Sequence, residues 1–365
     1  MKRLSVTLLA SMLLFSGILH AQEAEEEDES LKISGSVDTY YKYDFSGTAN
    51  IGTSFADEQN SISIGMIDLL FEKTTGKTSF VGEIAFGPRN IAGAGPASGT
   101  EIAFLQPRFE GVTDSASSFF LKDFAPRIQN LYVSYALTDQ ISITGGYMGT
   151  FVGYELISPT GNFNYSTSYL FTNGPFQNAG VKLNYDVNDR FGVMVGVFNP
   201  WNVYTADPEI GPSSIGAQVY VSPVDGWDAY VNFIAGGESG TEIDLTTTYQ
   251  VTDNLLLGLN AASYSSTTLG ADSASGFSGA ALYVNYGLTD NAALGLRAER
   301  FNTNDGFGGK DGVTAITLSG NLTSGGLTLI PEFRVDLASY DAFTDSNGAA
   351  TSSALQFLLA AVYAF

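Results

Sequence analysis

Polar and apolar residues alternate along much of the chain, and within this alternation a five-residue phrase, Tyr-x-(Leu/Val)-(Thr/Asn)-Asp, occurs four times. Alternating segments lie on both sides of each copy, for example residues 131–135 before the first. Period-two alternation around a short polar segment predicts two β-strands joined by a tight turn. The copies are Tyr135 to Asp139, Tyr185 to Asp189, Tyr249 to Asp253 and Tyr286 to Asp290.

The tyrosine of this phrase stands at one fixed distance from the turn, on the same strand face as the Leu or Val two residues later. A soluble hairpin has no need of an aromatic ring at constant depth. A bilayer interface does, because amphipathic rings settle at the headgroup level. The repeat therefore predicts a transmembrane β-barrel with a belt of tyrosines near one membrane surface.

Counting such segments predicts sixteen strands, and short turns between them alternate with longer loops rich in Gly, Ser, Asn and Asp. This order is typical of outer-membrane barrels, which have short periplasmic turns and long extracellular loops. We expect an all-β fold, a transmembrane antiparallel up-and-down barrel of about 16 strands, with fourteen or eighteen left open. The predicted strands are 31–45, 61–73, 78–87, 127–137, 140–148, 177–187, 191–199, 214–222, 227–236, 241–251, 254–264, 277–288, 291–301, 312–322, 327–339 and 353–365.

The last predicted strand carries a second membrane signal. From Leu355 onward every position on one of its faces is apolar, up to the terminal Phe365. A final alternating strand that ends in an aromatic residue resembles the signal by which outer-membrane barrels are recognised for insertion. The residues on its predicted outer face are Leu355, Phe357, Leu359, Ala361, Tyr363 and Phe365.

The N-terminal residues have the parts of a secretory signal peptide: a positive start at Lys2 and Arg3, an apolar run, and a small-residue cleavage site at Ala21. No later segment has about 18 consecutive apolar residues, the length of a helical membrane span. Acidic residues dominate the next segment, which we expect to be a disordered tail. The expected division is a signal peptide (1–21), an acidic tail (22–30) and a barrel (31–365).

Composition narrows the choice of partners. The chain has 38 acidic and 16 basic residues, and two of the basic ones lie in the predicted signal peptide. Such an excess of acid argues against nucleic acid, whose phosphates attract Lys and Arg. Charged residues are only 15% of the chain, while Gly, Phe and Tyr are abundant. A protein with a lipid-facing surface fits this composition, as does a soluble secreted all-β protein.

The strand face opposite the apolar one is expected to point into the barrel. Any single charge there is most simply a solvated wall residue paired across strands. Together they favour a water-filled lumen, because unpaired charges are costly in a packed core, and their excess of acid predicts a mild preference for cations. The predicted pore-lining residues are Asp38, Lys42, Asp68, Glu83, Lys182, Asp228, Asp244, Arg297, Glu299, Glu332 and Arg334, and Asp44, Glu72, Asp186 and Asp336 are further acids on the same face.

Two predicted loops, 88–126 and 150–176, are long enough to be ordered and functional. The second is rich in aromatic residues. One hypothesis is that it folds inward and narrows the channel. The alternative, which the sequence favours equally, is an extracellular lid packed on its own aromatic residues. The residues predicted near a constriction are Tyr154, Glu155, Asn164 and Tyr165.

Catalytic and metal-binding chemistry has little support. The only histidine, His20, lies in the predicted signal peptide, and there is no cysteine. Nucleophilic constellations built on His or Cys are therefore excluded from the mature chain, as are ordinary zinc and iron sites. Calcium needs only oxygen ligands, but no ligand spacing supports it. We expect no enzyme activity and no cofactor.

The second long loop and the segments after it carry a family resemblance. Residues 153–159 (GYELISP), 162–171 (NFNYSTSYLF) and 174–176 (GPF) resemble the signature segment of the β-barrel porin-2 family, the OmpL-like porins. Asn199-Pro-Trp201 and Asp225-Gly-Trp227 are similar to its continuation, except that Pro200 replaces an expected Gly. The match is clearest over residues 120–235. The resemblance implies an outer-membrane porin but names no solute.

Three functions remain in competition. The leading one is a porin in the outer membrane of a Gram-negative-type bacterium, which contacts lipid outside and passes small hydrophilic solutes or ions passively inside. The second is a non-conducting surface-binding or structural outer-membrane barrel that acts through its long loops. The third is a soluble secreted β-protein that binds carbohydrate through its aromatic residues. A homo-oligomer is left open, because no interface patch is separable from the lipid-facing surface.

Overall fold

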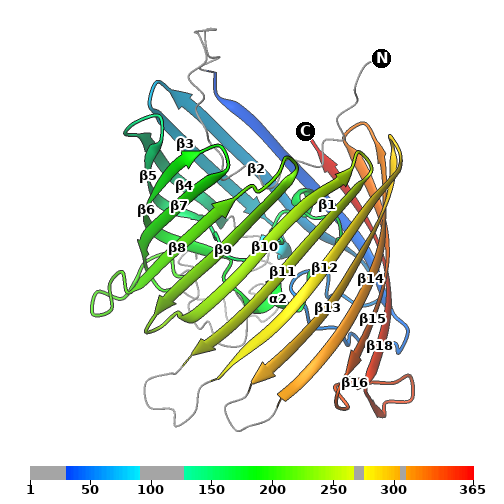
Figure 1. The fold of residues 1–365 in the computed structure, drawn as a ribbon. Helices are drawn as coiled ribbons and strands as arrows, with labels where there is room; N and C mark the ends of the chain where they lie inside the picture. Colours follow the sequence, from blue (N-terminus) through cyan, green and yellow to red (C-terminus); the bar gives the residue numbers. More distant parts are fainter. Residues whose placement is uncertain (1–29, 91–126, 267–274, 305–309) are drawn as a thin grey trace, which may run out of the picture.

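The computed structural model describes residues 30–90, 127–266, 275–304 and 310–365. These residues form a closed antiparallel barrel (Figure 1). The predicted signal peptide, almost all of the acidic tail, and residues 91–126 of the first long loop lie outside the described residues.

Sixteen strands make the barrel, as the alternation predicts, and their bounds differ from the predicted ones by only a few residues. The first eight are β1 Lys32–Asp44, β2 Ser61–Thr75, β3 Thr78–Phe86, β4 Arg127–Ala136, β5 Ile141–Gly149, β6 Gln177–Asn188, β7 Phe191–Phe198 and β8 Ser214–Val221. The others are β9 Trp227–Gly236, β10 Gly240–Thr252, β11 Leu255–Ser266, β12 Ser275–Thr289, β13 Ala292–Asn304, β14 Lys310–Ser324, β15 Leu327–Ala338 and β18 Ser353–Ala364.

Strands that follow one another in sequence pair antiparallel, and β1 pairs with β18 to close the cylinder. This seam runs from Ser36 opposite Ala364 to Asp44 opposite Gln356. A separate hairpin of β16 (Phe343–Thr344) and β17 (Ala350–Thr351) lies in the connection between β15 and β18. The start of β1 and the C-terminus lie at the end of the barrel that carries the short turns (Figure 1).

The repeated phrase forms the short turns, and its Thr or Asn accepts backbone hydrogen bonds within them. Thr138 and Thr252 each accept hydrogen bonds from the backbone N–H groups two and three residues later. Asn188 and Thr289 each accept one from the N–H group two residues later. A side-chain oxygen at this position satisfies donors that a tight turn leaves unpaired.

The two faces of the wall differ as the alternation requires. The four tyrosines of the phrase are all exposed on the outer face, together with Leu, Ile and Val side chains from almost every strand. On β18, Leu355, Leu359 and Tyr363 point outward, whereas Leu358 and Val362 are buried inside. The barrel thus presents an apolar exterior with a ring of aromatics near its short turns, the arrangement of a lipid-facing wall.

The seam between the first and last strands gives a test of closure. Gly35 and Phe365 exchange two backbone hydrogen bonds, each 3.0 Å long, at the short-turn end of the seam. Deletion of Phe365 removes both, and we expect a destabilisation of roughly 1–3 kcal/mol. Urea unfolding of the barrel refolded in lipid measures this. Tyr286→Ala, which removes another belt aromatic far from the seam, is the control; an equal loss in both variants would contradict a special role for closure.

Candidate functional site

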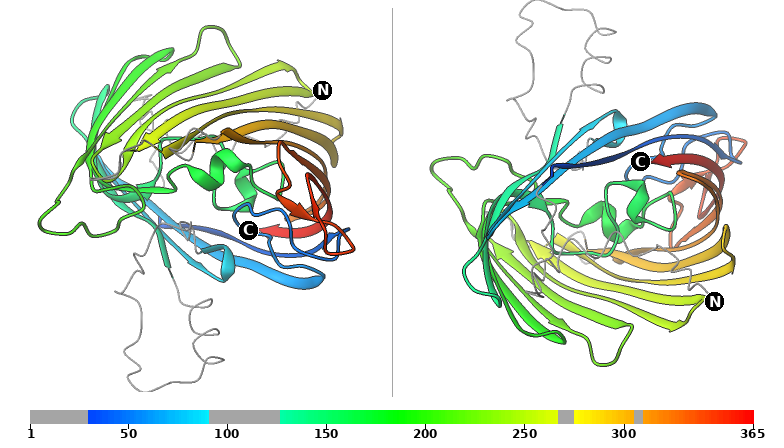
Figure 2. Two further views of the ribbon diagram at one scale, coloured as in Figure 1. Left: turned by 90° about the horizontal axis from the view of Figure 1, so that it is seen from below. Right: turned by 90° about the horizontal axis from the view of Figure 1, so that it is seen from above.

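Residues 150–176, between β5 and β6, fold into the barrel and are termed the inner segment. Viewed along the barrel in Figure 2, this segment lies within the ring of strands. It contains η2 Pro159–Gly161 and the short helix α2 Tyr169–Asn173. Tyr165 at its centre has no exposed surface. Of the two arrangements that the sequence allows for this loop, the structure therefore has the inward one.

The helix α2 forms because both its own chain and the wall cap its start. Ser168 takes an extended conformation and its hydroxyl accepts the N–H of Phe171. Glu299 on β13 accepts the N–H groups of Tyr169 at 2.9 Å and Leu170 at 2.8 Å. These first-turn donors have no partner within a helix, and a carboxylate beside them is favoured by the helix dipole. The wall thus fixes the helix at its N-terminus.

Arg297 on β13 is one of two buried wall arginines that bond to the inner segment. Its guanidinium donates to the Glu155 carboxylate at 2.6 Å and to the carbonyls of Ser166 at 2.6 Å and Thr167 at 3.2 Å. Arg297 has no exposed surface, and the Glu155 side chain is 3% exposed. A buried ion pair of this kind is costly to break, because either partner alone would be a buried, uncompensated charge.

A second buried arginine, Arg334 on β15, joins the inner segment to another loop. It donates twice to Asp336, at 2.8 and 3.0 Å, and also to the Thr167 carbonyl at 2.8 Å. It further donates to the Thr53 hydroxyl in the β1–β2 loop at 3.2 Å. The Tyr169 ring lies 5.1 Å from its guanidinium carbon, within the range of a cation–π contact.

Carboxylates of β1 and β15 hold the middle of the inner segment. Glu332 accepts the backbone N–H groups of Tyr165 at 3.0 Å and Ser166 at 3.3 Å. The Tyr165 hydroxyl donates to Asp38. Burial raises the pKa of the Tyr165 phenol well above its usual range, so the group stays a neutral donor at any physiological pH. These wall carboxylates therefore bind backbone N–H groups and a neutral hydroxyl of the segment.

Glycines on the inner face of the wall leave room for rings of the inner segment. A side chain at Gly258 would place its Cβ 2.3 Å from the Tyr154 hydroxyl, and one at Gly295 would place it 2.2 Å from the Phe163 ring. Tyr154 also stacks on Tyr283 of β12, with ring centroids 4.2 Å apart. These strand glycines mark a close approach of the segment to the wall.

The structure places most of the predicted pore-lining side chains out of solvent. Glu83 and Asp228 keep partial exposure; Glu83 accepts from Asn130, and Asp228 accepts from Tyr220 at 2.7 Å. The other nine are buried: Asp38, Lys42, Asp68, Lys182, Asp244, Arg297, Glu299, Glu332 and Arg334. Six of these nine bond directly to the inner segment: Asp38, Asp244, Arg297, Glu299, Glu332 and Arg334. The simplest expectation was that these charges are solvated wall residues. These six residues instead bond to the inner segment.

The four residues predicted near a constriction all lie on the inner segment and contact the wall. Tyr154 stacks on Tyr283, Glu155 pairs with Arg297, and Tyr165 bonds to Asp38. Asn164 donates to Ser319 on β14 at 2.7 Å. They are anchors of the segment, and their effect on conduction stays a prediction.

Sequence reasoning missed the neutral members of this network. Ser168 caps α2 and also bonds to Glu155, and Ser319 bonds to both Asn164 and Glu332. Gly258 and Gly295 were also missed. A Gly on the inward-facing side of an otherwise bulky strand is the signal that could have pointed to a close approach.

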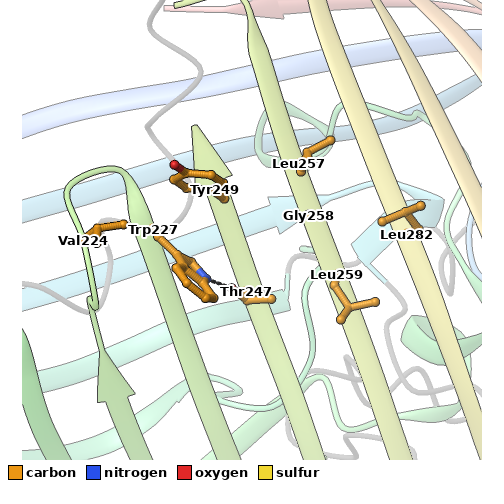
Figure 3. Close-up of a pocket in the computed structure, with 8 residues that line it drawn as sticks. All are labelled: Val224, Trp227, Thr247, Tyr249, Leu257, Gly258, Leu259 and Leu282. Carbon is orange, nitrogen blue, oxygen red and sulfur yellow. Dashed lines mark hydrogen bonds between the residues drawn. The ribbon is translucent and has the colours of Figure 1, made fainter. Parts of the chain in front are cut away.

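A hollow of about 450 Å³ lies on the outer wall, near the short turns after β8 and β10. Figure 3 shows it between Trp227, Tyr249 and three leucines, with the Trp227 indole donating to Thr247 at 2.9 Å. Trp227 and Tyr249 belong to the exposed outer face. This hollow faces the membrane and not the lumen, so it belongs to the lipid-contacting surface.

Two absences concern only the described residues. None of their helices is long and apolar enough to cross a membrane. They also contain no group of three or more His, Cys, Asp or Glu side chains placed to hold a metal ion.

Comparisons with known proteins agree with this architecture. The sequence model of the family described as "Putative beta-barrel porin-2, OmpL-like" matches residues 30–365. No curated protein matches the chain.

Several solved structures share the fold at low identity. The outer membrane channel DcaP of Acinetobacter baumannii is 15% identical, with a TM-score of 0.60 over 92% of this chain and 97% of that one. A trimer form of OmpT, an outer membrane protein of Vibrio cholerae, is 12% identical, with a TM-score of 0.57 over 92% and 99%. An anion-selective porin from Comamonas acidovorans is 12% identical, also with a TM-score of 0.57 over 92% and 99%. At such identity the likeness shows the fold alone.

The buried pair of Arg297 and Glu155 can be tested by a double-mutant cycle. Arg297→Met leaves Glu155 buried without its cation, and we expect a loss of about 3–5 kcal/mol in the free energy of unfolding. Adding Glu155→Gln should cost much less than the sum of the single losses, with a coupling of roughly 1–3 kcal/mol. Equilibrium unfolding in denaturant measures all three variants.

The matched control is the ion pair of Arg190 and Asp225, which has the same type of contact at 2.7 Å but is exposed at a short turn. Its cycle, Arg190→Met with Asp225→Asn, should show coupling close to zero. Equal coupling in the two cycles would contradict the view that burial makes the inner pair strong.

Proposed function

Because the chain belongs to the β-barrel porin-2, OmpL-like family, whose members are outer-membrane channels and not enzymes, we propose that it is a porin for passive diffusion of small hydrophilic solutes, with a mild preference for cations. One observation carries the preference. The four basic side chains predicted to line the pore are all buried: Lys42, Lys182, Arg297 and Arg334. Lys32, on the same face of β1 and opposite Glu72, is exposed at the short-turn end. Four inner acids keep partial exposure: Glu72, Glu83, Asp186 and Asp228.

The positions of these four acids support an acidic path. Glu72, Asp186 and Asp228 lie within a few residues of the short turns, and Glu83 is central on β3. The buried bases, in contrast, are near other charges that already compensate two of them, Arg297 by Glu155 and Arg334 by Asp336. Accessible charge of one sign in a confined aqueous path raises the local concentration of the opposite ion. Cations are therefore favoured.

The inner segment supplies the proposed constriction. It is held to β10 through Asp244, to β13 through Arg297 and to β1 through Asp38, so it crosses much of the lumen. We expect solutes to pass beside it, and the size of that passage to set the exclusion limit.

The same anchoring favours a second candidate, a barrel that does not conduct. Six wall charges are bound to the inner segment instead of facing water, as a fixed plug would require. Conduction in planar bilayers separates the two functions, because a plugged barrel passes no ions.

The remaining parts of the proposal concern location and assembly. We propose export by the signal peptide of residues 1–21 to the outer membrane of a Gram-negative-type bacterium, with lipid on the apolar exterior. Assembly into a homo-oligomer stays open; a trimer form is described for OmpT of Vibrio cholerae.

Replacing residues 154–168 by a short Gly-Ser linker tests the constriction. We expect a higher single-channel conductance in planar bilayers, because the replaced part occupies lumen cross-section. Replacing the tip of the β16–β17 hairpin, residues 345–348, is the control and should leave conductance unchanged. Unchanged conductance in the first variant would rule out the constriction, and no conductance in the wild-type protein would favour the plugged barrel.

Neutralising the accessible acids tests selectivity. Each of Glu72→Gln, Glu83→Gln, Asp186→Asn and Asp228→Asn should lower the cation-to-anion permeability ratio. A charge roughly 8 Å away in water changes the occupancy of each ion about two-fold, in opposite directions, so the ratio should fall by about four- to six-fold. Reversal potentials under a salt gradient measure the ratio. Asp290→Asn removes the same charge from an exposed turn outside the lumen and should have little effect. Anion selectivity in the wild-type channel would overturn the assignment.

A further inference from the structure

One arginine of the barrel points away from the lumen, on the face that contacts lipid. Glu299 and Arg300 are neighbours on β13, so their side chains lie on opposite faces of the wall. Glu299 is buried on the inner face, and Arg300 is exposed on the outer one. Leu294 and Leu296, on the same outward face of β13, are exposed as well. Arg300 therefore interrupts an apolar surface with a positive charge.

The depth of this charge in the wall follows from the strand register. Leu294 pairs with Tyr286 of the tyrosine belt, and Arg300 is six residues further toward the loop end. At about 3.3 Å per residue and a strand tilt of about 40°, Arg300 lies roughly 15 Å beyond the belt, in an apolar band about 25 Å tall. A charge on the lipid face is costly at the middle of this band and costs little at its edge. A side chain that extends toward the loop end brings the charge to that edge.

The guanidinium of Arg300 does extend toward the loop end, and a glycine makes room for it. Gly312 on β14 pairs with Asn302, the next outward residue of β13 in that direction. A Cβ atom at Gly312 would clash with Nη2 of Arg300 and with Oδ1 of Asn302. Nη1 of Arg300 donates to the hydroxyl of Thr314, also on β14, at 3.1 Å. The guanidinium thus lies between two polar neighbours, and Arg300, Asn302 and Thr314 are termed the arginine patch.

The arginine patch presents hydrogen-bond donors that no described residue uses. Among the described residues, the Arg300 side chain bonds only to Thr314 and forms no ion pair. A guanidinium has five N–H donors in a planar fork, which matches the oxygens of a phosphate. Ser278 of β12, exposed opposite Asn302, adds a hydroxyl beside it. The patch is therefore suited to an anion that approaches from the membrane.

We propose that the arginine patch binds a phosphate of the lipopolysaccharide in the outer leaflet, with the acyl chains of this glycolipid against Leu282 and Ile316. This inference rests on the proposed location in the outer membrane, with the short turns on the periplasmic side. The phosphates of lipopolysaccharide lie at the boundary between its sugars and its acyl chains, and the patch lies at the matching edge of the apolar band. Leu282 and Ile316 are exposed on the side of the patch that faces the middle of the membrane. Basic groups at the membrane surface attract anionic lipid head groups.

Titration of the full-length protein in nonionic detergent with rough-type lipopolysaccharide tests the site, with native mass spectrometry to count the bound glycolipid. Arg300→Gln should weaken binding about ten-fold or more, because it removes the charge-assisted hydrogen bonds. Gly312→Ala keeps every charge but displaces the guanidinium, so it should weaken binding too. Lys73→Gln removes an exposed cation beside the short turn after β2 and should bind like the wild type.

Several outcomes would overturn the site. Equal affinity of Arg300→Gln and the wild type would do so, as would undiminished binding of the glycolipid after its phosphates are removed. Equal affinity for phosphatidylglycerol would overturn the choice of glycolipid, and displacement by inorganic phosphate alone would overturn the choice of a lipid. Bilayer conductance of the same preparations keeps this inference separate from the porin proposal. A channel that conducts without binding glycolipid overturns only the site, and a barrel that binds glycolipid without conducting overturns only the porin.

Discussion

The pairing of β1 with β18 is the interaction on which the rest of the molecule depends. In a hydrocarbon environment no water satisfies a free strand edge, so the sheet must close on itself. Closure joins residues more than three hundred positions apart, as in the pairing of Ser36 with Ala364. It also creates the enclosed interior, without which the inner segment would have no opposite wall to bind and the buried charges no partners.

Inside the closed wall, the inner segment and the charged side chains of the strands satisfy each other's hydrogen bonds. Arg297, Arg334, Glu299 and Glu332 would be wall charges in water if the segment were absent, and the segment would expose bare backbone groups if the charges were absent. Their combination gives a network of buried hydrogen bonds and ion pairs between the segment and the wall. The acids near the short turns keep partial exposure, and this difference underlies the proposed selectivity.

The sequence predicts the barrel well because an alternation of polar and apolar residues with a period of two, interrupted by turn residues, is compatible with few other folds. It predicts which charges point inward for the same reason: Asp38, Glu332 and Arg334 lie opposite an apolar face. It cannot say whether those charges meet water or protein, because that depends on where the 150–176 loop goes. Tyr154 and Tyr165 could equally pack on their own loop or on a distant strand, and the neighbouring sequence does not distinguish these two arrangements. The phrase predicts where the short turns lie but not which side chain stabilises them, and Thr138 and Thr252 accept backbone N–H groups there.

Many of the hydrogen bonds that hold the inner segment are made with its main chain. The arginines bind the carbonyls of Ser166 and Thr167, and the glutamates bind the N–H groups of Tyr165, Ser166, Tyr169 and Leu170. Main-chain atoms are the same in every amino acid, so these contacts depend on the backbone conformation of the segment more than on its side chains. Side chains between the anchors can therefore vary while the path is kept. The contacts that hold the inner segment in place are thus largely separate from the side chains that it presents to the lumen. Those side chains could therefore be replaced to engineer a pore of chosen specificity.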